Sequence, residues 1–175
     1  FHPAVPARMH ALLPAAKLVV LLRDPVRRAY SHYWHERARG RETLEFEDAI
    51  AVEPQRIATA EAGLADGSIA RSADHQRFSY LARGRYAQQL ERWLALYSRE
   101  RLHVVRFEDL VKEPLGGLNE TLAFLGLPAA SRVDLEARNT RRYPPLPEAT
   151  AQRLREYFEP HNRQLERLLG RPLGW

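Results

Sequence analysis

The chain has no cysteine and only two lysines, Lys17 and Lys112. Without Cys it has no disulfide bonds, no thiolate nucleophile and no Cys-ligated zinc. No apolar run approaches the roughly 18 residues of a membrane span, and the longest, residues 18–22, has the length of a buried strand. The first residues show neither the basic nor the apolar region of a signal peptide. A thiol enzyme, a disulfide scaffold and a membrane-spanning segment are therefore all excluded for this stretch.

Arginine supplies almost all of the positive charge: 25 of the 27 basic residues are Arg, against 22 acids. The net charge is +5 and the sequence pI is about 9.9. An Arg-rich, Lys-poor composition is typical of a GC-rich bacterial genome. It also suits bidentate binding of phosphate or sulfate by guanidinium groups. With 45% hydrophobic and 28% charged residues in 175, the composition predicts one soluble globular domain.

The first half of the chain predicts a strand followed by helices. Residues 17–22 form a continuous apolar run, which predicts a strand buried on both faces, as in a parallel sheet. Asp24 then suits an N-cap and Pro25 the first position of a helix over 25–38. A helix over 45–62, interrupted at Pro54, is expected next. Residues 63–79 contain few large apolar side chains, which predicts an exposed loop.

The second half repeats the alternation. Residues 83–86 open a helix whose apolar side chains recur at helical spacing, and 102–107 predict a second strand. A helix over 115–125 ends at a Gly. A loop with three prolines covers 139–147, and a last helix over 148–169 is broken or bent at Pro160. Strand, helix, strand, helix is the order of an α/β fold.

The strongest local signal follows the first strand. Arg23 stands at the end of that strand, where ligands bind in open α/β sheets, and a helix N-terminus offers free N–H groups there. Arg27, Ser31 and His35 recur every four residues and share one helix face. The pattern indicates an anion site with Arg23 and Ser31 as donors. An ion pair of Arg23 with a nearby carboxylate explains the same residue without any ligand.

The segment 22–31 resembles the 3′-phosphate-binding motif of sulfotransferases that use 3′-phosphoadenosine 5′-phosphosulfate (PAPS). In that family an Arg and a Ser eight positions later bind the 3′-phosphate of the donor, and Arg23 and Ser31 match both types and the spacing. Further family features follow in the same order over nearly the whole chain. They are Gly84 and Tyr86, Phe107–Leu110, Pro114, Phe124–Leu127, Asn162, Leu168–Gly170 and Trp175. The match is closest to the bacterial and heparan-sulfate-type branch.

That branch has a basic loop over the nucleotide, commonly with Lys-Gly-Arg. This chain has Asn139 and Thr140 in place of Lys-Gly, followed by Arg141, Arg142 and Tyr143. The resemblance implies that Thr140, Arg141, Arg142 and Tyr143 bind the donor by phosphate contact and adenine stacking. Without the resemblance, a solvated Pro-rich loop is the simpler interpretation.

The resemblance also implies the fold: a P-loop-NTPase-like α/β domain, with a parallel sheet flanked by helices. The family's Lys- and Thr-bearing loop for the 5′-phosphosulfate is not found here. Residues 1–175 are therefore expected to be the C-terminal portion of a single sulfotransferase domain, incomplete at the N-terminus and inactive alone. The general base, typically Glu or His, is expected upstream of Phe1. Glu108 and Asp109 are interpreted as structural, by capping a turn or pairing with Arg.

The implied reaction moves a sulfuryl group from PAPS in line to a hydroxyl or amine, leaving adenosine 3′,5′-bisphosphate (PAP), with no metal. Arg83, Tyr86 and His35 are candidates for acceptor binding. The acceptor class stays open among glycan, lipid, peptide and small metabolite, as does the oligomeric state. The absent cysteines favour a cytoplasmic bacterial enzyme. Rival predictions are a P-loop kinase-like enzyme using ATP, a basic nucleic-acid-binding module, and a non-catalytic domain that binds a sulfated partner. The nucleic-acid-binding module is disfavoured because the Arg residues are interleaved with acids.

Overall fold

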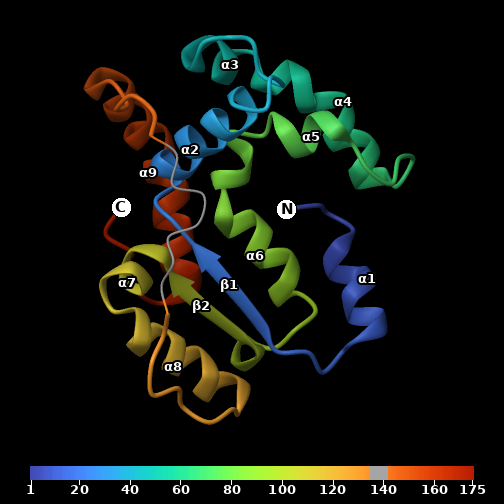
Figure 1. Cartoon of the computed structure of the whole chain (residues 1–175). Helices are drawn as coiled ribbons and strands as arrows, with labels where there is room; N and C mark the ends of the chain where they lie inside the picture. Colours follow the sequence, from blue (N-terminus) through green and yellow to red (C-terminus); the bar gives the residue numbers. More distant parts are fainter. Residues whose placement is uncertain (135–141) are drawn as a thin grey trace.

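A computed structural model of the chain describes residues 1–134 and 142–175 (Figure 1). The predicted donor-loop residues Thr140 and Arg141 lie outside these described residues. No helix within the described ranges is long and apolar enough to cross a membrane. The elements, in chain order, are α1 Val5–Leu12, β1 Leu18–Leu22, α2 Pro25–Arg37, α3 Phe46–Ala51, α4 Glu53–Asp66, α5 Ala73–Arg77, η1 Ala82–Gly84, α6 Tyr86–Leu94, η2 Arg99–Arg101, β2 Leu102–Arg106, α7 Phe107–Lys112, α8 Pro114–Leu125 and α9 Glu148–Leu169.

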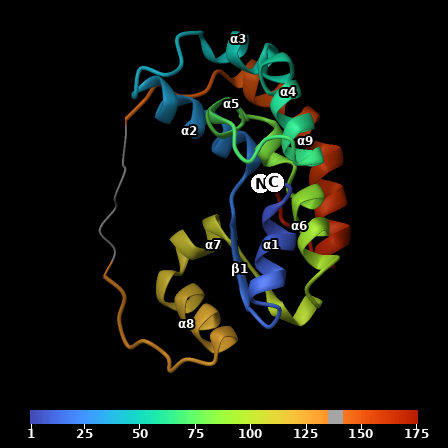
Figure 2. The same cartoon turned by 90° about the vertical axis from the view of Figure 1, so that its right-hand side faces the viewer.

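A parallel pair of strands forms the centre of the molecule. β1 pairs with β2 so that Leu18 lies opposite Leu102 and Leu22 opposite Arg106. Seen edge-on, α7 and α8 lie on one side of the strands and α6 and α9 on the other (Figure 2). The α/β class and the parallel sheet expected from the sequence are therefore confirmed.

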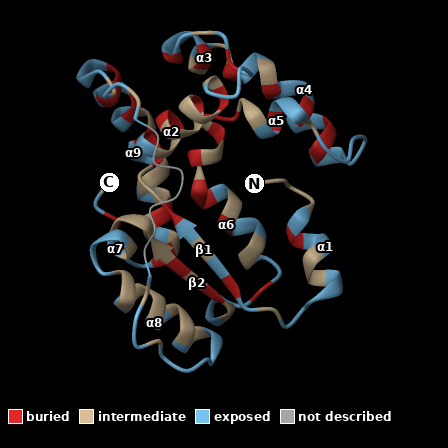
Figure 3. Cartoon of the chain, in the orientation of Figure 1, coloured by how far each residue is buried: buried red, intermediate tan, exposed pale blue. Residues whose placement is uncertain are grey.

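The prediction that β1 is buried on both faces is wrong. Leu18 and Leu22 are buried, but Val19 is 44% and Leu21 54% exposed (Figure 3). The reason is the position of α8, whose Phe124 stacks on His103 of β2 with ring centroids 5.1 Å apart. α8 therefore covers β2, while no described element covers these two side chains of β1.

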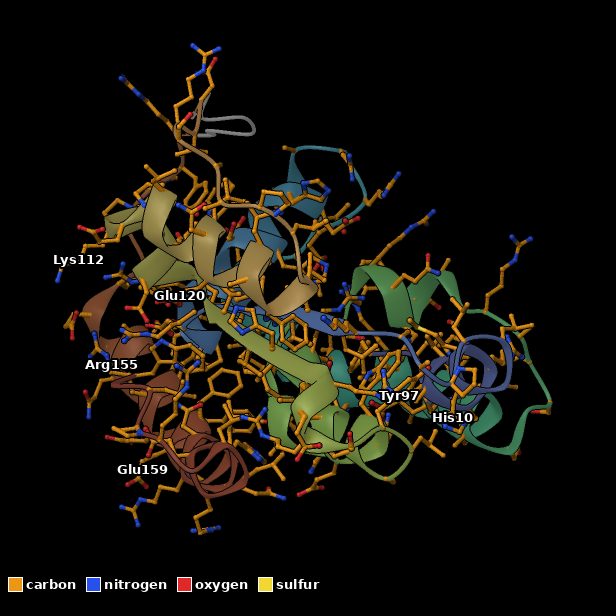
Figure 4. The ribbon with its side chains drawn as sticks, turned by 90° about the horizontal axis from the view of Figure 1, so that it is seen from below. His10, Tyr97, Lys112, Glu120, Arg155 and Glu159 are labelled. Atoms are coloured by element: carbon orange, nitrogen blue, oxygen red, sulfur yellow. The ribbon has the colours of Figure 1, made fainter. Side chains whose placement is uncertain are left out.

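Two hydrophobic clusters hold the layers together. The first joins the strands to α6, α9 and the C-terminal residues: Leu18, Leu22, Tyr86, Leu90, Leu102, Val104, Leu165, Leu169 and Leu173. The second joins α2 and α3 to α9 and contains Val26, Tyr30, Tyr33, Phe46, Tyr80, Leu154 and Phe158. α1 attaches to the first cluster through His10, which packs edge-on against Tyr97 at 5.0 Å (Figure 4). Since α9 contributes to both clusters, it fixes α2 relative to the sheet.

The helices predicted around the first strand form with small changes. α2 begins at Pro25 as expected, and Asp24 caps it. The helix expected over 45–62 is instead two helices that meet at Val52, because Pro54 occupies the first turn of α4. Proline is tolerated there, since a first-turn N–H has no helical partner to lose. The last helix, α9, is continuous through Pro160, so the expected break does not occur.

The prediction of an exposed loop over 63–79 holds only for residues 67–72, which lie between two helices. α4 continues to Asp66, and α5 forms with Ser72 as its N-cap, accepting from the His75 N–H at 3.2 Å. His75 and Ser79 are buried. Gly63 packs so closely that a Cβ there would stand 3.0 Å from Ile69 Cγ1. Gly63 thus serves close packing, whereas Gly67 ends α4 with a φ of 81° in open space.

Candidate functional site

Arg23 lies at the carboxyl end of β1 with its backbone and side chain both held. Its carbonyl accepts a hydrogen bond from the Tyr86 hydroxyl at 2.9 Å. Its guanidinium lies over the ring of Phe107, 5.1 Å from the ring centre, which is a cation–π arrangement. Among the described residues it has no hydrogen-bond or ion-pair partner. A partly exposed, positioned and unpaired guanidinium is suited to binding an anion.

Glu108 ties the ends of the two strands together. One oxygen accepts from the Asp24 N–H at 2.9 Å and the other from the Trp175 Nε1–H at 3.3 Å. Arg106 pairs with Glu108 at 3.6 Å and with Asp109 at 3.4 Å. The structural interpretation of this acidic pair agrees with these contacts.

The N-terminus of α2 does not offer the free N–H groups that the sequence led us to expect. Oδ1 of Asp24 accepts from Val26 at 2.8 Å and from Arg27 at 3.3 Å. The Arg28 N–H bonds to the Asp24 carbonyl at 2.9 Å, and Pro25 has no N–H. An anion at this end of the helix must therefore be held by side chains.

Ser31 lies on α2, partly exposed, with no hydrogen-bond partner for its hydroxyl among the described residues. Tyr30 and Trp34, which flank Ser31 in the sequence, contact Tyr143 and Pro144. Tyr143 stacks on Trp34, with ring centroids 5.8 Å apart, and packs edge-on against Tyr30 at 5.5 Å. The Tyr30 hydroxyl also donates to the carbonyl of Pro144 at 3.0 Å. The structure thus brings Tyr143 alongside the turn of Ser31.

The remaining predicted residues are placed as follows. Arg142 is exposed. Tyr86 is buried, which raises the pKa of its hydroxyl to about 12, and that hydroxyl bonds to Arg23. His35 is partly exposed, contacts Arg39 and lies 3.9 Å from Glu36. Arg83 donates to the Gln76 carbonyl at 3.0 Å.

A cleft of about 640 Å³ opens beside the start of α2, lined by residues of α2, α9 and the C-terminus. Arg155 and Glu159 of α9 belong to its lining (Figure 4). Neither Arg23 nor Ser31 lines it. It contains four carboxylates, Asp24, Glu148, Glu156 and Glu159, against the two arginines Arg27 and Arg155. The excess of negative charge disfavours a polyanionic ligand in this cleft. The size of the cleft therefore does not make it the donor-binding site.

Sequence reasoning missed a set of buried polar residues behind α2. Both oxygens of Glu53 accept backbone N–H groups, from Leu81 at 2.6 Å and Ala82 at 2.7 Å. Arg28 donates to the Tyr80 carbonyl, and His32 packs against the Tyr80 ring at 5.0 Å. The spacing of Arg28, His32 and Glu36, every four residues, is a signal that could have identified this row. Within residues 1–134 and 142–175, no cluster of three or more His, Asp or Glu side chains is arranged to hold a metal ion.

Comparison with known proteins decides the family. The family model described as the sulfotransferase domain matches residues 3–158. The chain belongs to the sulfotransferase family. A sulfotransferase of known structure, from Alicyclobacillus acidocaldarius, superposes with a TM-score of 0.76 at 31% identity, covering 99% of this chain and 62% of that one.

Curated relatives extend well beyond this sulfotransferase domain. The bifunctional heparan sulfate N-deacetylase/N-sulfotransferase of Drosophila melanogaster is 35% identical over 189 residues, covering 95% of this chain and 17% of that protein. The heparan sulfate glucosamine 3-O-sulfotransferase 3B1 of Mus musculus is 28% identical over 194 residues, covering 97% and 46%. The chain thus spans less than half the length of either relative.

Proposed function

We propose that this chain binds the 3′-phosphate of PAPS in an enzyme that transfers a sulfuryl group to a hydroxyl or amine. Membership of the sulfotransferase family supports the reaction class. The observation that carries the donor assignment is Arg23, whose guanidinium is positioned by Phe107 and by the Tyr86 bond yet has no described counter-ion. Ser31, Arg142 and Tyr143 contribute from α2 and from the segment packed on it. Thr140 and Arg141 extend the same proposal outside the described residues.

The residues fit this donor on chemical grounds. A phosphate monoester needs charged or hydroxyl donors, and Arg23 and Ser31 supply both from groups that are not otherwise engaged. Asp24 has already taken the α2 amides, so the phosphate depends on these side chains. The 3′-phosphate is what distinguishes PAPS from ATP, and these contacts therefore select the donor.

We further propose that the 5′-phosphosulfate is bound by a P-loop-like strand, loop and helix added at the free edge of β1. The two edges of the sheet differ. At β2, Arg99 donates to the Leu102 carbonyl at 2.8 Å and Arg171 to the Val104 carbonyl at 2.7 Å. No such bonds to β1 occur among the described residues, and a groove of about 470 Å³ runs along it, lined also by Met9, Leu90 and Trp93. Unpaired strand edges accept further strands.

In this proposal the acceptor oxygen or nitrogen forms a bond to sulfur as the bond between sulfur and the 5′-phosphate oxygen breaks. The acceptor proton passes to a general base outside residues 1–175, and PAP leaves. The residues of this chain hold the donor in line and do not touch the sulfur. Catalysis then depends on positioning and on electrostatic stabilisation of the leaving phosphate. The curated relatives are named for heparan sulfate, so a glycan is the acceptor class to test first.

A comparison of PAP and ATP binding tests the donor. Calorimetry on the intact protein is expected to give tighter binding of PAP than of ATP, with no requirement for magnesium. The P-loop kinase-like alternative predicts the reverse, so magnesium-dependent binding of ATP in preference to PAP would exclude our proposal.

The 5′ half of the proposal has its own test. Residues 1–175 alone are expected to give no turnover of PAPS, because they lack the loop that binds the phosphosulfate. Measured sulfuryl transfer by the isolated 175-residue chain would contradict the second proposal and leave the role of Arg23 intact.

A further inference from the structure

Two arginines face each other across the junction of α2 and η1 without a dedicated counter-ion. Arg28 lies on α2 and Arg83 in η1, and the two elements are in contact. The Nε atoms of both are buried and have no hydrogen-bond partner among the described residues. Their other bonds go to neutral carbonyls: Arg28 to Tyr80, and Arg83 to Gln76. Buried guanidinium groups left partly unbonded are costly unless an anion completes them.

A histidine completes the same surface. His32, one turn after Arg28 on α2, has a buried Nδ1 with no hydrogen-bond partner among the described residues. Its ring is held edge-on against Tyr80 at 5.0 Å. All three residues keep part of their surface exposed, whereas Nε of both arginines and Nδ1 of His32 are themselves buried.

The nearby carboxylates are committed elsewhere. Glu53 uses both oxygens on the backbone N–H groups of Leu81 and Ala82. Glu36 pairs with Arg41 at 3.3 Å and lies 3.9 Å from His35. Neither makes a hydrogen bond or ion pair with Arg28 or Arg83. Glu53 and Glu36 act on the pair only from a distance, where they raise the pKa of Arg28 and of Arg83 respectively, and neither closes a direct ion pair.

The titration of neighbouring groups agrees with a positive field. Burial lowers the pKa of Arg28 and Arg83 lowers it further, while Tyr86 and Glu53 act in the opposite direction. Burial, Arg28 and Arg83 lower the pKa of His32 to about 3. On the other side of Arg83, burial and that arginine lower the pKa of His75 to about 4. Both histidines are thus neutral at pH 7.

We propose that Arg28, His32 and Arg83 form a binding site for an oxyanion, carboxylate or sulfate, carried by the acceptor. This inference rests on the proposed function, because it makes the flank of α2 next to the Ser31 row the acceptor side of the enzyme. The proposed donor row on α2 contains Ser31. Arg28 and His32 each follow a residue of that row, Arg27 and Ser31, so they form a separate row on the same helix. A single helix then presents the donor phosphate and the acceptor anion with separate sets of residues, which specifies an anionic acceptor.

The test is a titration of inorganic sulfate into the intact protein already saturated with PAP, so that the donor site is filled. Calorimetry is expected to show one further sulfate site in the wild type. Arg83→Gln is expected to weaken it by about tenfold or more, the usual loss for a charged hydrogen bond. Arg92→Gln, which removes the same charge from an exposed position on α6, is the matched control and is expected to change it less than twofold.

A second variant guards against a misfolded protein. His32→Phe keeps a ring against Tyr80 but removes the ring nitrogens, and a severalfold weakening of sulfate binding is expected. Absence of the second sulfate site in the wild type, or equal affinity in Arg83→Gln, His32→Phe and the wild type, would overturn the proposal.

Failure of the proposed function is distinguishable from failure of this site. If PAP does not bind at all, the donor assignment fails, and sulfate is then titrated into Arg23→Ala, where the donor site is disabled.

To identify the anion, the Michaelis constants of a carboxylated, a sulfated and a neutral acceptor are compared. Arg83→Gln is expected to raise those of the anionic acceptors about tenfold and leave that of the neutral one unchanged. An equal change for all three would contradict an acceptor-anion role.

Discussion

Two rows of side chains on α2, displaced by one residue, have different surroundings. Arg27, Ser31 and His35 are partly or fully exposed, and Ser31 lies beside the segment that packs on Tyr30 and Trp34. Arg28 and His32 contact Tyr80, on the side where α2 packs on η1, and Glu36 is buried. Since consecutive helix positions point about 100° apart, a one-residue offset separates the more exposed row that carries Ser31 from a more buried polar row. In our two proposals the same helix contributes to two binding surfaces.

The largest expected difference between the rows is in stability. Arg28→Ala leaves the Tyr80 carbonyl without its donor and a gap behind α2, and is expected to lower the free energy of unfolding by about 3 kcal/mol. Ser31→Ala removes only an unpaired, partly exposed hydroxyl and is expected to change it by less than about 0.5 kcal/mol. Urea unfolding of the two variants measures the contrast. Equal losses would mean that the rows are not distinct.

A pH-dependent effect follows from the neutral histidines. In the unfolded chain His32 and His75 bind a proton below about pH 6.5, whereas in the folded chain they stay neutral to about pH 3 and 4. The unfolded state therefore binds more protons in this window, and stability falls as the pH drops from 6.5 toward 4. The fall approaches about 1.4 kcal/mol for each pH unit and each histidine.

Urea unfolding at pH 7, 6 and 5 measures this slope. The double variant His32→Phe, His75→Phe is expected to flatten it. If the slope persists unchanged in the double variant, the pH dependence arises from other groups and the positive field behind α2 is smaller than inferred.

Local sequence signals predicted the elements on either side of Arg23 well. An apolar run followed by Arg-Asp-Pro specifies a strand, an N-cap and a helix start, and all three form. What it did not reveal is that Asp24 occupies the amides of its own helix, because a capping residue and an anion compete for the same donors. The role of Tyr86 on Arg23 was also missed, since the two residues lie 63 positions apart.

The errors concentrate where tertiary packing decides. Residues 63–79 are poor in large apolar side chains, yet α5 forms there because Ser72 caps it and Gly63 allows close packing with Ile69. β1 was expected to be covered on both faces because its composition is uniformly apolar, but covering depends on where α8 lies. The Arg28 and His32 row lacks a motif of its own, and only periodicity on α2 marks it.

The central claim, that Arg23 binds the 3′-phosphate of the donor, is tested most directly by comparing PAP with AMP, which lacks that phosphate. By calorimetry on the intact protein, Arg23→Ala is expected to weaken PAP binding by about tenfold to a hundredfold and to leave AMP binding within twofold. Arg27→Ala, whose side chain is 71% exposed, is the control and is expected to change neither. Loss of affinity for PAP and AMP by the same factor, or unchanged binding of PAP, would contradict the claim.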